Sequence, residues 1–164
     1  MYTSRPATAP IDTMIPLRFR MSRARRDTAL AAVSGLAFAL SFPNPSYGLI
    51  SWVALVALLV STWEATVAKA ARLFFLAGTL AHLILLRWAL VQTYYAGAWV
   101  VFGVVGLATY YGLHWAAIGA VWSWIRRKHP AFCLPAIFGL LWMASETLQT
   151  SRSLLLSMPS HLAY

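Results

Sequence analysis

The sequence is poor in charge, and above all in negative charge. Only 10% of its 164 residues are charged, and four Asp and Glu residues stand against thirteen Lys and Arg residues. A soluble domain of this size carries about 25% charged residues, which coat its surface. Because 60% of the residues are hydrophobic, too little polar surface remains to cover a water-soluble globule. We therefore expect lipid to cover most of the folded chain.

Cysteine and the common catalytic motifs are also scarce. Cys133 is the only cysteine, so no internal disulfide bond can form and the redox compartment cannot be inferred from cysteine usage. The patterns CxxC, HExxH, GxxxxGK[ST] and GxSxG do not occur, and these are the usual signs of redox, zinc, nucleotide and serine-hydrolase sites. We expect no catalytic residue, no cofactor and no metal site in these residues.

One apolar run is long enough to cross a membrane with length to spare. Residues 98–125 contain no Asp, Glu, Lys or Arg, and as a helix they would extend roughly 42 Å. That exceeds the roughly 30 Å hydrocarbon core of a bilayer, where backbone polar groups must be satisfied within a helix. The run ends at Arg126, Arg127 and Lys128, a cluster typical of the cytoplasmic side.

Four more apolar segments accompany this helix. The first, 28–41, is short and follows a basic stretch, which is also typical of a signal peptide. We prefer a short first helix because further apolar segments follow it directly. The predicted fold class is an all-α integral membrane protein with about five transmembrane helices, at 28–41, 49–63, 73–91, 98–125 and 131–149.

The distribution of cations predicts the orientation of these helices. Residues 1–27 are expected to form a disordered basic cytoplasmic tail, and 150–164 an extracytoplasmic tail that looks truncated. With the N-terminus in the cytoplasm and five spans, eleven of the thirteen cations lie inside, and only Arg87 and Arg152 fall toward the outside. This is the positive-inside pattern. It explains the net charge of +9 without a nucleic-acid partner.

Two charged residues of the predicted spans are candidates for function, because stranding a charge in lipid costs at least about 2.5 kcal/mol. Arg87 and Glu146 lie about one turn below the outer ends of the third and fifth spans. We expect either that they pair, or that Arg87 reaches a lipid phosphate while Glu146 faces the helical bundle. A structural ion pair or simple snorkelling would explain both residues without any chemistry.

Three other candidates are His82, His114 and Trp88. Neither histidine has a His or carboxylate residue three or four positions later, so hydrogen bonds between helices are expected in place of a metal site. Trp88 lies near Tyr94 and Tyr95 at the predicted outer turn. Such rings commonly anchor a protein at the membrane interface, and a vestibule for lipid head groups is the alternative.

A series of short motifs follows the apolar segments in order. It comprises Leu36-Ala37-Phe38-Ala39-Leu40-Ser41-Phe42-Pro43, Tyr47-Gly48-Leu49, Trp52-Val53-Ala54-Leu55-Val56, Trp88, Leu141-Trp142-Met143-Ala144-Ser145-Glu146 and Met158-Pro159-Ser160-His161-Leu162-Ala163-Tyr164. Together the motifs resemble the N-terminal membrane region of the apolipoprotein N-acyltransferase family. Thr147 and Gln149 stand where that family has Trp and Arg. Conjugal-transfer proteins of the TraB type share the layout and remain a possible branch.

The resemblance implies a multi-pass protein of the bacterial inner membrane. Members of the family transfer an acyl chain from a phospholipid to the amino group of a lipidated N-terminal cysteine. Their catalytic Glu-Lys-Cys triad belongs to a periplasmic nitrilase-like domain, and this chain stops before that domain would begin. We therefore expect a membrane module that contacts phospholipid and, through the catalytic domain, a lipoprotein substrate. The alternative is a small non-enzymatic scaffold, or a component of a conjugal transfer or transport complex.

Overall fold

The computed structural model describes residues 22–43, 45–129 and 134–152. These residues contain helices and turns and no strand, which confirms the predicted all-α class for this part of the chain. The elements are α1 (Arg23–Leu40), the 3₁₀ helix η1 (Pro45–Tyr47), α2 (Gly48–Thr62), α3 (Val67–Leu85), the 3₁₀ helix η2 (Leu86–Gln92), α4 (Thr93–Ala96), α5 (Trp99–Lys128) and α6 (Leu134–Arg152).

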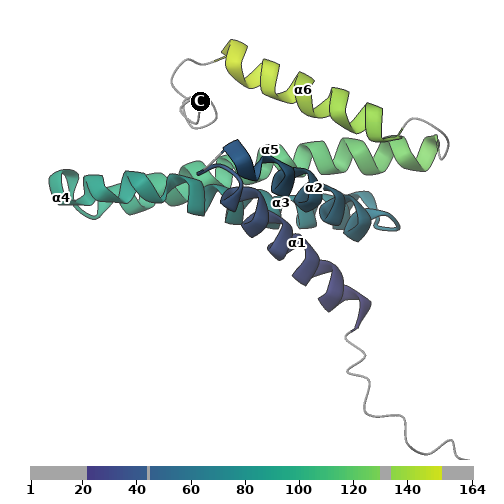
Figure 1. Cartoon of the computed structure of the whole chain (residues 1–164), viewed down its shortest axis with the longest axis horizontal. Helices are drawn as coiled ribbons and strands as arrows, with labels where there is room; N and C mark the ends of the chain where they lie inside the picture. Colours follow the sequence, from purple (N-terminus) through teal and green to yellow (C-terminus); the bar gives the residue numbers. More distant parts are fainter. Residues whose placement is uncertain (1–21, 44, 130–133, 153–164) are drawn as a thin grey trace, which may run out of the picture.

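A long antiparallel hairpin forms the centre of the fold. The first arm runs through α3, η2 and α4, and α5 returns beside it as the second arm (Figure 1). Gly97 reverses the chain between the arms with a φ of 70°, and its N–H donates to the Thr93 carbonyl at 2.9 Å. A side chain would be strained at this φ, so glycine suits the reversal.

The two arms are the described helices that are long and apolar enough to cross a membrane. They comprise Val67–Ala96 and Trp99–Lys128, each with 30 residues, which corresponds to about 45 Å of helix. Gly48–Thr62 and Ala136–Leu148 are shorter apolar helices. Many large apolar side chains face outward, especially on α2 and α5. Lipid is the environment that suits such a surface.

Close contact between α3 and α5 depends on glycine. A Cβ atom added at Gly78 would lie 2.7 Å from Cγ of Trp115, and one added at Gly119 would lie 2.5 Å from Cγ of Phe74. Each ring therefore rests directly on the backbone of the opposite helix. In lipid, where no hydrophobic effect drives helices together, such close van der Waals packing holds them.

The other helices pack around this hairpin. α1 lies against α3 and α2, while α6 runs back along α5 from its C-terminal end (Figure 1). The buried core draws on α1, α2, α3, α5 and α6 and consists of Ala31, Leu58, Leu73, Phe74, Ala77, Trp115, Ile118, Trp122 and Phe138. The aromatic rings of Phe38, Trp115 and Trp142 join α1, α5 and α6, with centroids 4.9 to 6.0 Å apart.

Several helices begin earlier or end later than hydropathy predicted. Helix α1 begins at Arg23, so the prediction of a disordered tail up to residue 27 is wrong for its last five residues. Ser22 caps this helix by accepting from the Arg25 N–H at 3.4 Å, and Thr66 caps α3 in the same way. Caps of this kind start a helix ahead of its apolar run.

Differences also occur at the later segments. The predicted turn around residues 92–97 is helical as far as Ala96, and the last helix continues to Arg152, past the predicted end at 149. Cys133, residues 1–21 and residues 153–164 lie outside the described residues, so the predictions for them stay predictions.

Candidate functional site

Three of the five candidate side chains lie on α5 or on a helix that packs against it. They are His82 of α3, His114 of α5 and Glu146 of α6. His82 and Trp142, which is the hydrogen-bond partner of Glu146, both meet the ring of Trp115 on α5. We call His82, His114 and Glu146 the polar cluster. Its members are far apart in the sequence, but their helices are neighbours.

His82 is held by its own helix and by an aromatic ring of the next. Its Nδ1 atom lies 2.8 Å from the carbonyl oxygen of Gly78, one turn earlier in α3. The ring stacks on Tyr111 of α5 with centroids 4.3 Å apart and planes 8° apart, and meets the edge of Trp115 at 6.1 Å. The hydrogen bond therefore lies within one helix, in contrast to the expected bond between helices, because a carbonyl four residues earlier is within easy reach.

Glu146 is an exposed residue of α6 whose carboxylate is held by its own helix. It accepts a hydrogen bond from Nε1 of Trp142 at 2.8 Å, and Trp142 meets Trp115 edge to face at 5.0 Å. Nε2 of His114 is buried and has no hydrogen-bond partner among the described residues. The contact between the two tryptophan rings holds α6 against α5, and His114 can donate a hydrogen bond to a polar group or accept one from it.

The chemistry available to the polar cluster is limited. It contains two imidazoles and one carboxylate, and no hydroxyl or thiol nucleophile lies among its three members. Within residues 22–43, 45–129 and 134–152, no three His, Cys, Asp or Glu side chains gather as a metal site would require. Hydrogen bonding and proton exchange are the chemistry that this cluster can offer.

Arg87 and Trp88 lie away from the cluster, on the 3₁₀ helix η2. Both side chains are exposed. Arg87 forms no ion pair with Glu146 or with any other residue in the described ranges. Together with Tyr94, Tyr95 and Trp99, which are also strongly exposed, Trp88 marks what we call the aromatic end of the hairpin.

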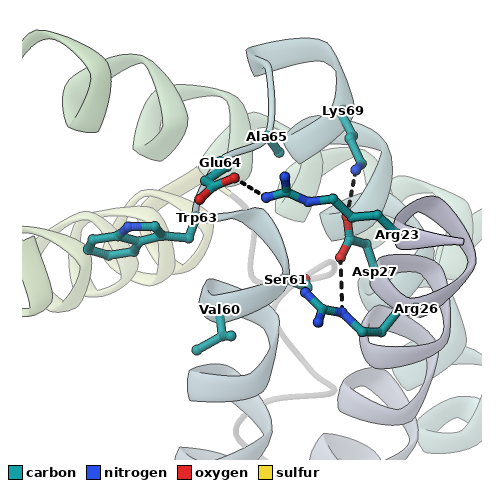
Figure 2. A pocket seen from close by; sticks show the side chains of 9 residues that line it. All are labelled: Arg23, Arg26, Asp27, Val60, Ser61, Trp63, Glu64, Ala65 and Lys69. Carbon is teal, nitrogen blue, oxygen red and sulfur yellow. Dashed lines mark hydrogen bonds and ion pairs between the residues drawn. The ribbon is translucent and has the colours of Figure 1, made fainter. Parts of the chain in front are cut away.

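A second polar region, at the opposite end of the hairpin, was missed by sequence reasoning. Asp27 of α1 is almost fully buried and accepts a hydrogen bond from Lys69 of α3 at 2.5 Å. Arg23 pairs with Glu64 in the loop after α2 (Figure 2). No local spacing could reveal pairs that lie about forty residues apart. The cap at Ser22 was the available sign that Arg23 and Asp27 are helical.

The last turn of α5 closes this region. Arg127 and Ser123 both donate to the carbonyl oxygen of Ala65, each at 3.2 Å, and so tie α5 to the loop before α3. The guanidinium of Arg126 lies 5.5 Å from the ring centroid of Trp63, within cation–π range. We call this region the basic end; its cations are Arg23, Arg26, Lys69, Arg126 and Arg127.

Positive charge at the basic end affects Glu64 in particular. The hydrogen bond and the charge of Arg23 lower the pKa of the Glu64 carboxyl below its ordinary value, and Arg126 and Arg26 add to this effect. The carboxylate form is thus favoured here. Arg23 is the residue that forms an ion pair with Glu64.

Comparison with known proteins gives two matches. Residues 34–164 match the family described as apolipoprotein N-acyltransferase N-terminal domain. The chain is 35% identical over 127 residues to an apolipoprotein N-acyltransferase of Geobacter metallireducens. The aligned region covers 74% of this chain and 24% of that protein. The chain thus spans about a quarter of the length of that relative. No solved structure matches.

Proposed function

Because the chain belongs to the apolipoprotein N-acyltransferase family, as its N-terminal domain, we propose that it is the membrane domain that holds phospholipid for acyl transfer to lipoproteins. Catalysis belongs, in this proposal, to a nitrilase-like domain beyond these residues. The observation that carries the proposal is the family match over residues 34–164. The outward-facing apolar side chains of α2 and α5 support contact with lipid.

The proposed setting is the bacterial inner membrane, with five spans and the N-terminus in the cytoplasm. The basic end supports this orientation, since it brings together the start of α1, the α2–α3 loop and the end of α5. These are the segments that the positive-inside rule assigns to the cytoplasm. The aromatic end lies at the opposite end of the hairpin (Figure 1), where the tyrosine and tryptophan rings suit the outer interface.

Within this domain we expect Glu146 to have a structural role. Its carboxylate accepts a hydrogen bond from Nε1 of Trp142, and the ring of Trp142 packs on Trp115 of α5. Glu146→Gln should weaken the hydrogen bond that positions this ring. We therefore expect Glu146→Gln to lower the membrane abundance of the protein. Normal abundance with lost acyl transfer would contradict this structural role and give Glu146 a direct part in the reaction.

A chimaera tests the proposed function. The matched N-terminal segment of the Geobacter metallireducens enzyme is replaced by the matched segment of this chain, and N-acylation of a lipoprotein is followed by mass spectrometry. We expect acyl transfer to continue, because the segment supplies the same membrane domain. The matched control carries a scrambled α2 and is checked for equal abundance.

The outcome that contradicts the proposal is specific. A chimaera that reaches the membrane in normal amount, with its catalytic domain folded, but transfers no acyl chain would show that this chain does not serve the reaction. The non-enzymatic scaffold or transfer-complex component would then be the better description.

A further inference from the structure

A cavity of about 410 Å³ opens at the basic end (Figure 2). It lies where the start of α1 faces the end of α2 and the start of α3. Its lining consists of Arg23, Arg26, Asp27, Val60, Ser61, Trp63, Glu64, Ala65 and Lys69. Three cationic side chains and two carboxylates give the lining a net charge of +1. The cavity is therefore suited to an anion with a single charge.

Arg26 is the least tightly held of the three cations. Lys69 is hydrogen bonded to Asp27 at 2.5 Å, and Arg23 is paired with Glu64. In contrast, Arg26 forms only a looser ion pair with Asp27, in which its Nε lies 3.9 Å from the carboxylate, too far for a hydrogen bond. Figure 2 shows its guanidinium reaching from α1 toward Ser61 of α2. A guanidinium presents paired N–H donors that match two phosphate oxygens.

An apolar stripe on α2 leads to the same cavity. It comprises Leu49, Val53, Val56, Val60 and Trp63, with exposures between 49% and 77%. The spacing of four, three, four and three residues places them on one face of the helix. Val60 and Trp63 also line the cavity. The stripe is about 21 Å long, enough for an acyl chain that crosses one leaflet, or half of the roughly 30 Å core.

We propose that this cavity binds the phosphodiester of an anionic phospholipid, such as phosphatidylglycerol, with one acyl chain lying along the α2 stripe. Arg26 donates to the phosphate oxygens, and the single negative charge of the phosphodiester balances the surplus positive charge of the lining. The site lies at the end opposite to the aromatic end and holds a structural lipid. The proposal rests on the membrane embedding given above, with the basic end at a bilayer surface.

Lipid retention by the full chain tests this site. The 164-residue chain is placed in phosphatidylcholine nanodiscs doped with phosphatidylglycerol. Native mass spectrometry then identifies the lipids that stay bound to the chain after it is released from the nanodisc. Arg26→Gln should retain about tenfold less phosphatidylglycerol, as expected for the loss of one charge-assisted contact. Arg25→Gln is the matched control, because it removes the same charge from the neighbouring residue, which does not line the cavity. Its retention should equal that of the unaltered chain.

A competition separates a lipid from a free phosphate. Inorganic phosphate and glycerophosphoglycerol carry the phosphate group without acyl chains, and neither should displace phosphatidylglycerol. Displacement by either compound would overturn the proposal in favour of a soluble-phosphate site. The proposal would also be overturned if Arg25→Gln and Arg26→Gln lost phosphatidylglycerol retention equally. The same holds if the unaltered chain retained phosphatidylcholine as well as it retains phosphatidylglycerol.

Membrane embedding is measured separately, by alkaline carbonate extraction of cell membranes that contain the same chain. A chain that resists extraction but retains no phosphatidylglycerol contradicts the lipid site alone. A chain that is extracted from the membrane contradicts the proposed function, and the lipid site with it. Circular dichroism of both variants confirms that helical content is unchanged, so a difference in retention reports on the site.

Discussion

The two ends of the hairpin are built in opposite ways. At the basic end, four segments are joined by ion pairs and by hydrogen bonds to one backbone carbonyl, that of Ala65. At the aromatic end, a single chain reversal at Gly97 connects the two arms, and the surrounding rings are exposed. Several segments therefore meet at the basic end, whereas the aromatic end consists of the two arms and the turn that joins them.

This difference teaches how a chain with few charges uses them. Two of its four carboxylates, Asp27 and Glu64, are at the basic end. There their ion pairs fix how α1 lies against the start of α3 and the loop before it, which apolar contacts alone would not specify. The aromatic end contains no carboxylate in residues 86–99 and depends on backbone geometry. Substitutions at the two ends should therefore have unequal effects on folding.

The largest difference is expected between two tryptophans of α5. Trp122 is 1% exposed, in the half of the helix that leads to the basic end, and Trp99 is 80% exposed at the aromatic end. Trp122→Ala should lower the free energy of unfolding by about 3–5 kcal/mol because it leaves a cavity in the core. Trp99→Ala should change it by less than about 0.5 kcal/mol. Denaturation in detergent micelles measures both, and equal losses would refute the contrast.

Asp27 should give the next largest effect. Asp27→Asn removes the charged acceptor of Lys69 at a buried position. Hydrogen bonds to charged groups contribute about 1.5–3 kcal/mol, so a loss of about 2 kcal/mol in the free energy of unfolding is expected. Glu64→Gln is the matched control at an exposed pair and should have a much smaller effect. If the control lost as much stability, burial of Asp27 would not be the cause.

Gly97 tests the aromatic end. Gly97→Ala places a side chain at a φ of 70° and should cost about 1–2 kcal/mol of stability. Gly103→Ala is the control, since a Cβ there meets no atom within 4 Å and alanine favours a helix. Thermal unfolding of the two variants should shift in opposite directions. A shared direction would mean that the reversal at Gly97 is not the strained position.

The smallest effect concerns pH. Arg23 lowers the pKa of Glu64, so the pair stabilises the fold at pH values above the ordinary carboxyl pKa. This stabilisation is lost as the pH falls through the lowered pKa of the folded state. The difference in melting temperature between the unaltered chain and Glu64→Gln should therefore shrink to nothing in acid. A difference that persists at low pH would show that protonation of Glu64 is not involved.

Much of the fold followed from the sequence, because apolar runs without charge predict helices directly. The all-α class was accessible in this way, and so was the long helix after Gly97. The helix starts at Arg23 and Val67 were missed, since the prediction followed hydropathy and gave no weight to the caps at Ser22 and Thr66. Capping is a local signal and could have been used.

The relation between candidate residues could not be predicted in the same way. Arg87 and Glu146 were expected at similar depth by counting residues from helix ends. Arg87, however, lies in a 3₁₀ segment, whose rotation per residue differs from that of an α-helix, so the direction of its side chain could not be counted from α3. The surroundings of Glu146 depend on how α6 packs on α5. Tertiary packing sets that geometry, and the sequence pattern does not.

Cysteine labelling tests most directly the claim that the two ends face opposite sides of the membrane. In a Cys133→Ser background, Ser22→Cys marks the basic end and Tyr95→Cys marks the aromatic end. A membrane-impermeant thiol reagent added to spheroplasts should label Tyr95→Cys at once and Ser22→Cys only after permeabilisation. Labelling of Ser22→Cys in intact spheroplasts, or of both positions equally, would contradict the proposed orientation.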